Sequence, residues 1–275
     1  MNYVEYSFII NPPSPWTEIL MAKLSLIEFE SFDENEIGVK GYILKDFDDE
    51  DFVKEQISQL EQVQISYEKT DVEQVNWNLE WEKHFNPIQI GNECYIRATF
   101  HEPKPEVDYE IIIQPKMSFG TGHHETTHLM VQFLLEEDVT GKSVLDMGTG
   151  TGILAILAKL KGADLVEGID IDEWSYENAI ENAEKNKVDA TFYKGGAERI
   201  PDRKYDIVLA NINKNILIED IPFYVNALKK NGILFLSGLY NFDGDDIKKE
   251  AFKYGLEFIQ LKERNEWISL KFMLK

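Results

Sequence analysis

The sequence predicts an α/β protein of two domains, a small α+β domain followed by a larger domain built around a mainly parallel sheet. Three observations predict it. Strand-like and helix-like stretches alternate beyond residue 140, which is typical of a parallel sheet with helices packed on it. A different order, β-α-β-β-α-β, fits the first 70 residues. A glycine-rich turn directly follows one buried strand of the larger domain.

The first 70 residues predict a ferredoxin-like unit. Residues 3–10, YVEYSFII, are β-branched and aromatic, as in strands. Helical spacing of apolar residues runs over 17–30, with Pro15 suited to the helix start. EIGVKGYILK and VQISYEK are strand-like, and between them DDEDFVKEQISQL has acids at the positive end of a helix dipole. The unit holds 15 acids against 5 bases.

Residues 71–91 predict a linker helix between the domains. Trp77, Trp81 and Phe85 recur at i, i+4 and i+8, so one helical stripe buries all three, and Pro87 ends the pattern. Core packing is a better explanation of this stripe than ligand stacking. The expected domains are therefore 1–70, a linker helix 71–91, and 92–275.

The larger domain begins with two strand-like runs, CYIRATF and YEIIIQP. Beyond residue 140, strands and helices alternate from SVLDM to LEFIQLKE and WISLKFML. The last two runs leave no room for a helix between them. They therefore predict an antiparallel hairpin at one edge of the sheet.

The stretch VLDMGTGTGILAILA carries the strongest chemical signal. A buried strand contains an acid near its end, three alternating glycines follow, and a helix begins. Glycines let the backbone turn sharply and approach a ligand closely, and the helix N-terminus offers free N–H groups. Ile153 stands where the dinucleotide pattern needs its third glycine, and the Walker lysine is absent. The residues concerned are Asp146, Gly148, Gly150 and Gly152.

Polar residues end the next strands. Asp170 lies at a strand end, where an acid can accept hydrogen bonds from both ribose hydroxyls. We favour it over Asp172, which suits a helix cap. Asn211 and Asn213 leave a later strand at the carboxyl edge, where ligands bind in open α/β sheets. The alternative role for either asparagine is a turn or a helix cap.

Residues 119–127, FGTGHHETT, allow a metal site, a phosphate cradle or a flexible lid. His123, His124, Glu125 and His128 are close in sequence but lack a metal-binding spacing such as H-E-x-x-H. With no cysteine cluster in support, we expect no metal. A phosphate would find no basic residue here. A glycine-rich lid over a ligand fits best.

Three sequence patterns carry a resemblance to a known family. The pattern D-x-G-x-G-x-G at 146–152 resembles the first motif of class I S-adenosylmethionine methyltransferases. FGTGHHETT resembles the F-G-T-G-x-H-x-T-T motif of the PrmA-type methyltransferases, which modify large-subunit ribosomal protein eleven. Residues 77–91 resemble the linker pattern WxxEWxxxFxPxxIG of that family. The resemblance covers the whole chain.

The resemblance implies a Rossmann-like class I methyltransferase domain with a seven-stranded, mainly parallel sheet. It also implies S-adenosylmethionine as the methyl donor and catalytic roles for Asn211 and Asn213. Departures from the family pattern occur at Glu125, where proline is common, and at Asn213, where leucine is common. The implied cofactor-binding residues are Phe119, Gly120, Thr121, Gly122, Thr127, Asp146, Gly148, Gly150, Gly152, Asp170, Ala197 and Asn211, with Gly196 as a further candidate near adenine.

Composition limits the partners. The net charge is −22, from 50 acids against 28 bases, which disfavours direct nucleic-acid binding and permits a basic partner. There is one cysteine, no secretory signal and no run approaching the ~20 apolar residues of a membrane span. We expect a cytoplasmic monomer that does not bind membranes.

The expected activity is methylation of lysine ε-amines and the N-terminal α-amine of large-subunit ribosomal protein eleven. The Asn/Asp-Pro-Pro-aromatic motif of nucleobase amino-methyltransferases is absent after the fourth strand. Methylation of another protein, RNA or a small amine stays open, as does a non-catalytic ribosome-associated role. A dinucleotide oxidoreductase is disfavoured by the glycine spacing.

Overall fold

The computed structural model describes residues 3–72, 85–116 and 118–275, and the chain divides into two compact units between residues 84 and 85. The proposed linker helix needs correction at both ends. Its first two residues belong to a strand that ends at Val72, and Ile88–Ile90 forms another strand. Trp77 and Trp81 lie outside the described residues.

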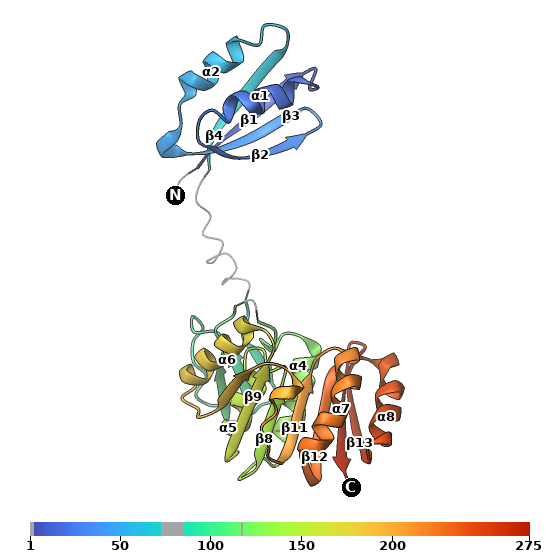
Figure 1. Ribbon diagram of the computed structural model, residues 1–275. Coiled ribbons are helices and arrows are strands. Elements are labelled where there is room, and N and C mark those ends of the chain that lie inside the picture. The colour runs from blue at the N-terminus through green and yellow to red at the C-terminus, as the bar shows by residue number, and fades with distance from the viewer. Residues whose placement is uncertain (1–2, 73–84, 117) are drawn as a thin grey trace. The chain divides into compact units, whose positions relative to one another are not determined.

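The first unit contains six main elements (Figure 1). They are β1 (Tyr3–Asn11), α1 (Trp16–Leu24), β2 (Phe29–Asn35), β3 (Gly38–Leu44), α2 (Glu50–Ser58) and β4 (Gln64–Val72), with a short 3-10 turn at Lys45–Phe47. The strands form one sheet in the order β2-β3-β1-β4, and every neighbouring pair is antiparallel. The element order is the β-α-β-β-α-β order read from the sequence.

The predicted helix over 17–30 is too long. Helix α1 ends at Leu24, and Phe29 already begins β2. The apolar residue Phe29 at the end of that stretch belongs to the strand, where its ring stacks on Phe32 with ring centroids 5.4 Å apart. Spacing alone does not separate a helix from a short strand that follows it.

The helices cover one face of this sheet. Alternate residues of β1, from Val4 to Ile10, are buried with Leu20 of α1 and Val53 of α2. Period-two burial along a strand is what a half-covered sheet requires.

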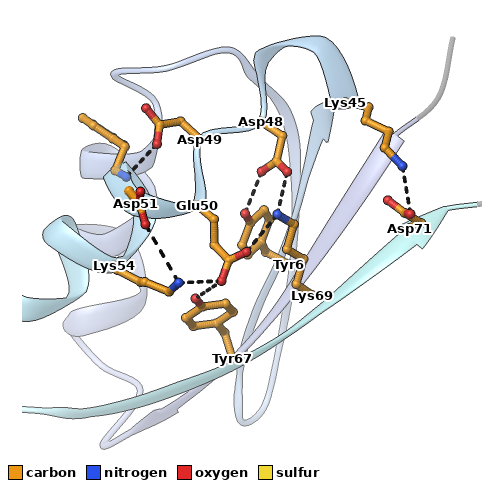
Figure 2. Close-up of polar contacts among 11 residues, drawn as sticks. Tyr6, Lys45, Asp48, Asp49, Glu50, Asp51, Lys54, Tyr67, Lys69 and Asp71 are labelled. Atoms are coloured by element: carbon orange, nitrogen blue, oxygen red, sulfur yellow. Dashed lines mark hydrogen bonds and ion pairs between the residues drawn. The ribbon is translucent and has the colours of Figure 1, made fainter.

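A polar network joins the start of α2 to the sheet (Figure 2). Lys69 Nζ lies 2.6 Å from Asp48 and 3.0 Å from Glu50. Tyr6 Oη donates to Asp48 at 2.6 Å, and Tyr67 Oη donates to Glu50 at 3.1 Å. The network therefore ties three segments of the unit together.

The second unit holds a seven-stranded sheet in the order β10-β9-β8-β11-β12-β14-β13. Pairs from β10 to β12 are parallel, and β12-β14 and β14-β13 are antiparallel. The predicted sheet and its edge hairpin are thus confirmed. The strands are β8 (Ser143–Met147), β9 (Leu165–Asp170), β10 (Thr191–Lys194), β11 (Tyr205–Asn211), β12 (Leu228–Tyr240), β13 (Leu256–Arg264) and β14 (Trp267–Leu274).

Helices cover both faces of this sheet (Figure 1). One buried cluster joins α4, α5 and α6 to the sheet, and a second joins α7 and α8 to the opposite face. The helices are α4 (Glu125–Glu136), α5 (Ile153–Leu160), α6 (Glu173–Lys185), α7 (Lys214–Ala227) and α8 (Gly244–Lys253), with 3-10 turns at Ala197–Arg199 and Asn241–Asp243.

A small three-stranded sheet precedes α4. It consists of β5 (Ile88–Ile90), β6 (Cys94–Arg97) and β7 (Tyr109–Ile112). Strand β6 pairs antiparallel with β5 and parallel with β7. The two runs predicted as strands at the start of this domain are β6 and β7. Within the described part of the chain, none of the helices is both long enough and apolar enough to span a membrane.

Candidate active site

The glycine loop, residues 148–152, connects β8 to α5. Gly148, Gly150 and Gly152 have φ values of +67°, +55° and +79°, a region that favours glycine. A Cβ added to Gly148 would lie 2.3 Å from Ile212 Cγ2, and one on Gly150 would lie 2.3 Å from the carbonyl oxygen of Phe119. The loop therefore needs glycine for both its turn and its close neighbours.

The lid loop, Phe119–Gly122, lies directly on the glycine loop. Thr151 donates its N–H to the Phe119 carbonyl at 2.9 Å and its hydroxyl to the Gly120 carbonyl at 2.5 Å. Gly120 and Gly122 have φ values of +101° and +90°. Two hydrogen bonds thus join the lid loop to the glycine loop, although some thirty residues separate these motifs in the sequence.

The two adjacent histidines do different things. His124 is the N-cap of α4, and its Nδ1 accepts the Thr126 N–H at 3.3 Å. His123 Nε2 lies 3.0 Å from the carbonyl oxygen of Asn86, which can only accept, so this nitrogen donates. Burial lowers the pKa of His123. Across the described ranges, no group of three or more His, Cys, Asp or Glu side chains is placed to hold a metal.

Asn211, the last residue of β11, meets Thr127 on α4. Its Nδ2 donates to Thr127 Oγ1 at 3.3 Å, and Thr127 is buried. The other amide atom, Asn211 Oδ1, is buried without a hydrogen-bond partner. Asn213 is exposed and caps α7, because its side chain accepts the Ile216 N–H at 3.2 Å. The structure therefore separates the two asparagines: the first has a free acceptor, and the second is occupied as a cap.

The two acids lie against the glycine loop. Asp146 Oδ2 accepts the Thr149 hydroxyl at 2.7 Å, while its Oδ1 is buried without a partner. Burial raises the pKa of Asp146 to about 7. Asp170 accepts the N–H of Gly150 at 2.8 Å and that of Asp172 at 3.0 Å, and burial raises its pKa. Asp172 occupies the N-cap position of α6 without a side-chain cap bond.

The loop after β10 reaches the same edge. Gly195 donates its N–H to the Asp170 carbonyl at 2.8 Å. This bond places Gly196 and the buried Ala197 next to Asp170. Ala197 also borders a cavity of about 510 Å³ that extends along α7 to Ala227. The loop is thus close enough to Asp170 to take part in the same binding site.

An aromatic recess of about 240 Å³ opens beside Asn211. Its lining residues are Phe119, His124, Thr126, Asn211, Ile212, Asn213, Gly238 and Trp267. Sequence reasoning missed Gly238 and Trp267. Trp267 begins β14, and nothing near it in the sequence marks a site; only the position of β14 beside β12 brings it to Asn211.

Comparison with known proteins identifies the family. The family model described as ribosomal protein L11 methyltransferase (PrmA) matches residues 19–275. Proteins named ribosomal protein L11 methyltransferase are 44% identical over 280 residues in Bacteroides fragilis, covering all of both chains. The one from Porphyromonas gingivalis is 41% identical over 283 residues, covering 99% of this chain and 98% of that protein.

A solved structure agrees with this assignment. The crystal structure of ribosomal protein L11 methylase from Lactobacillus delbrueckii subsp. bulgaricus matches with a TM-score of 0.65 at 28% identity. The match covers 70% of this chain and all of that one. With the matched family model and full-length relatives above 40% identity, the chain belongs to the ribosomal protein L11 methyltransferase (PrmA) family.

Proposed function

We propose that this chain methylates ribosomal protein L11 on lysine ε-amines and on the N-terminal α-amine. As a member of its family it is a methyltransferase that depends on S-adenosylmethionine. The unpaired atom Asn211 Oδ1 is the observation that favours an amine as the methyl acceptor. It is a buried acceptor without a partner, at a strand end beside an uncharged recess, and an amine N–H would satisfy it.

The residues present fit the cofactor. The glycine loop and the N-terminus of α5 offer backbone that a ligand can approach closely. Asp146 Oδ1 is an unpaired buried acceptor, suited to a cationic ligand. Bound S-adenosylmethionine supplies an electrophilic methyl group on a sulfonium. The residues that would hold it are Thr127, Asp146, Gly148, Gly150, Gly152, Asp170, Ala197, Asn211 and the lid loop.

The chain's own contribution to the reaction is positioning and desolvation. A free lysine amine has a pKa near 10.4, and removal from water lowers it, which favours the neutral nucleophile. The lining of the recess contains no carboxylate, so it offers no anion to hold the amine protonated. Asn211 Oδ1 accepts one amine N–H and turns the nitrogen lone pair toward the methyl group. Holding the two reactants in line then supplies most of the rate.

The first unit is the proposed substrate-recognition domain. Residues 1–70 hold 15 acids against 5 bases, and opposite charge steers a basic ribosomal protein toward it. The same charge disfavours direct contact with nucleic acid. We propose that the enzyme works in the cytoplasm as a monomer.

Mass spectrometry tests the target. Ribosomal proteins from a cell that lacks the enzyme are incubated with the purified full chain and S-adenosylmethionine. We expect mass gains in steps of one methyl on L11, lost with Asn211→Ala and with Asp170→Ala. Thr191→Val, an exposed change on β10, is the control and should keep full activity.

Other outcomes discriminate between the alternatives. Label on another protein, RNA or a small amine with L11 unchanged rejects the substrate and keeps the enzyme class. Cofactor binding without any methylated fraction supports the non-catalytic role. Calorimetry that finds NADH binding and no S-adenosylmethionine binding rejects the whole proposal.

A further inference from the structure

A row of four rings lines and extends the aromatic recess. Ring centroids are 5.1 Å apart for Phe119 and His124, 4.6 Å for His124 and Trp267, and 3.9 Å for Trp267 and Tyr240. The rings come from the lid loop, the N-cap of α4, β14 and the end of β12. Four separate segments therefore converge on one aromatic surface beside Asn211.

The polar content of the recess is small. None of its lining residues carries a carboxylate, an ammonium or a guanidinium group, and its buried acceptor without a partner is Asn211 Oδ1. Two nearby charged groups are engaged elsewhere: Glu125 accepts from Asn265 at 3.0 Å, and Lys214 pairs with Asp243 at 2.9 Å. An amine in the recess thus meets one buried acceptor that has no other partner, beside the rings of Phe119, His124 and Trp267.

We propose that Trp267, together with His124 and Phe119, holds the nitrogen end of the substrate lysine against its ring face and thereby determines how many methyl groups that amine receives. The inference rests on the proposed function and deepens it. Trp267 is here a specificity-determining residue, and Asn211 keeps its role as the single acceptor.

The chemistry of the transfer explains why rings suit this position. The amine lone pair forms the new N–C bond, the C–S bond breaks with its electron pair going to sulfur, and the positive charge passes to nitrogen. Ring faces stabilise that cation, as they do for methylated ammonium groups. After a proton leaves to solvent, the methylated amine is a nucleophile again.

The same surface tolerates added methyl groups. A pocket lined by several acceptors would lose a hydrogen bond each time a methyl replaced an N–H. Here one N–H bonds to Asn211 Oδ1 in the mono-methylated amine, so the methyl group already present faces the aromatic wall at no cost. A dimethylated amine has no N–H left for Asn211, and the rings alone then hold it for the third transfer. Loss of Trp267 should therefore weaken the second and third transfers more than the first.

The distribution of methylation states tests this inference. The full-length enzyme, unmethylated L11 and S-adenosylmethionine are mixed, and tandem mass spectrometry measures mono-, di- and trimethylated lysine at equal total conversion. With Trp267→Leu we expect the ratio of dimethyl to monomethyl lysine to fall about fivefold or more, the effect of losing one ring–cation contact in a desolvated site. Trp267→Phe retains a ring and should stay within about twofold of the wild type.

Controls separate specificity from folding. Phe252→Leu removes a ring that is 56% exposed on α8, away from the recess, and should leave the distribution unchanged. Melting temperature and cofactor affinity confirm that each variant is folded. If Trp267→Leu does not fold, Phe119→Leu, whose ring is 52% exposed, tests the same wall and should shift the ratio in the same direction.

Three results would overturn the inference. One is a wild-type distribution from folded Trp267→Leu. Another is an equal loss at every transfer step, which indicates general positioning. The third is a Trp267→Phe variant that behaves like the leucine variant. If the wild-type enzyme leaves L11 unmethylated while methylating another protein, the proposed substrate fails instead, and the ratio is then measured on that protein's lysines.

Discussion

Thr151 donates its backbone N–H to the carbonyl of Phe119 at 2.9 Å, so the glycine loop directly supports the loop that carries the first ring of the aromatic recess. The Thr151 hydroxyl adds a second bond to the next carbonyl along the lid loop. Because Thr151 is fully buried, water cannot replace either bond. The position of the lid loop therefore depends on Thr151, a residue of the glycine loop.

Thr151→Val removes the hydroxyl and keeps the shape of the side chain. Losing the bond to Gly120 should loosen the lid loop and weaken S-adenosylmethionine binding about threefold to tenfold, the range for one hydrogen bond. Isothermal titration calorimetry measures the affinity, with Thr191→Val as the matched control. Unchanged affinity would show that the hydroxyl does not hold the lid.

Gly148→Ala should impair both stability and cofactor binding. The new Cβ would meet Ile212 Cγ2 at 2.3 Å, and the φ of +67° would remain unfavourable. We expect a loss of about 1–3 kcal/mol in the free energy of unfolding. Adding Ile212→Ala should restore part of it, because the clash disappears while the backbone strain stays. Chemical denaturation measures both variants, and no recovery in the double variant would argue against the clash.

Asp146 should make cofactor binding depend on pH. Burial raises its pKa to about 7 in the free protein, and a cationic ligand favours the carboxylate. Affinity should therefore rise with pH between about 6 and 8, with proton release on binding near pH 6.5. Calorimetry in buffers of different ionisation enthalpy detects the proton. Asp146→Asn should bind more weakly and lose the pH dependence; a variant that keeps it would assign the titration to another group.

The same raised pKa predicts a stability effect without ligand. The folded pKa lies above the unfolded value of about 3.9, so the folded state binds the extra proton and loses stability as pH rises from about 4 to 7. The difference in melting temperature, Asp146→Asn minus wild type, should therefore be larger at pH 8 than at pH 5. Thermal unfolding at the two pH values checks this, and a gap independent of pH would contradict it.

Lys69→Met should destabilise the first unit by about 1–3 kcal/mol, because Asp48 and Glu50 both lose a charged donor. Lys45→Met is the matched control: its pair with Asp71 is more than half exposed on both sides, so the change should cost under about 1 kcal/mol. Figure 2 shows both pairs. Hydrogen exchange along β4 in the full chain measures the loss of stability in each variant. Equal losses in Lys69→Met and Lys45→Met would show that the network around Lys69 stabilises the unit no more than an exposed ion pair does.

Much of the site could be predicted because its chemistry is local in sequence. A tight turn is predicted by the alternating glycines Gly148, Gly150 and Gly152. A parallel sheet brings the ends of its strands to one edge, and Asp170 and Asn211 lie at two of those ends. The structure brings these residues together with Thr127 and the lid loop. Their individual roles in binding and catalysis stay predictions.

The remainder depends on contacts that no local pattern encodes. Trp267 reaches the recess only through the pairing of β14 with β12. The bonds of Thr151 to the lid loop join two separate motifs, and the strand at Ile88–Ile90 follows a stretch whose aromatic spacing suggests only helix. The sequence leaves Asn213 open between a catalytic role and a cap. The structure shows the cap bond to Ile216, and a catalytic role for Asn213 stays a prediction.

Strand β14 follows both β12 and β13 along the chain yet lies between them in the sheet, and its first residue is Trp267. During translation, β12 and β13 therefore each have an unpaired strand edge until β14 has left the ribosome. A chain that stops before Trp267 exposes two strand edges that invite aggregation, and it lacks one wall of the recess. If Trp267 has the proposed role, translation products that stop before it should be inactive and prone to removal by proteases.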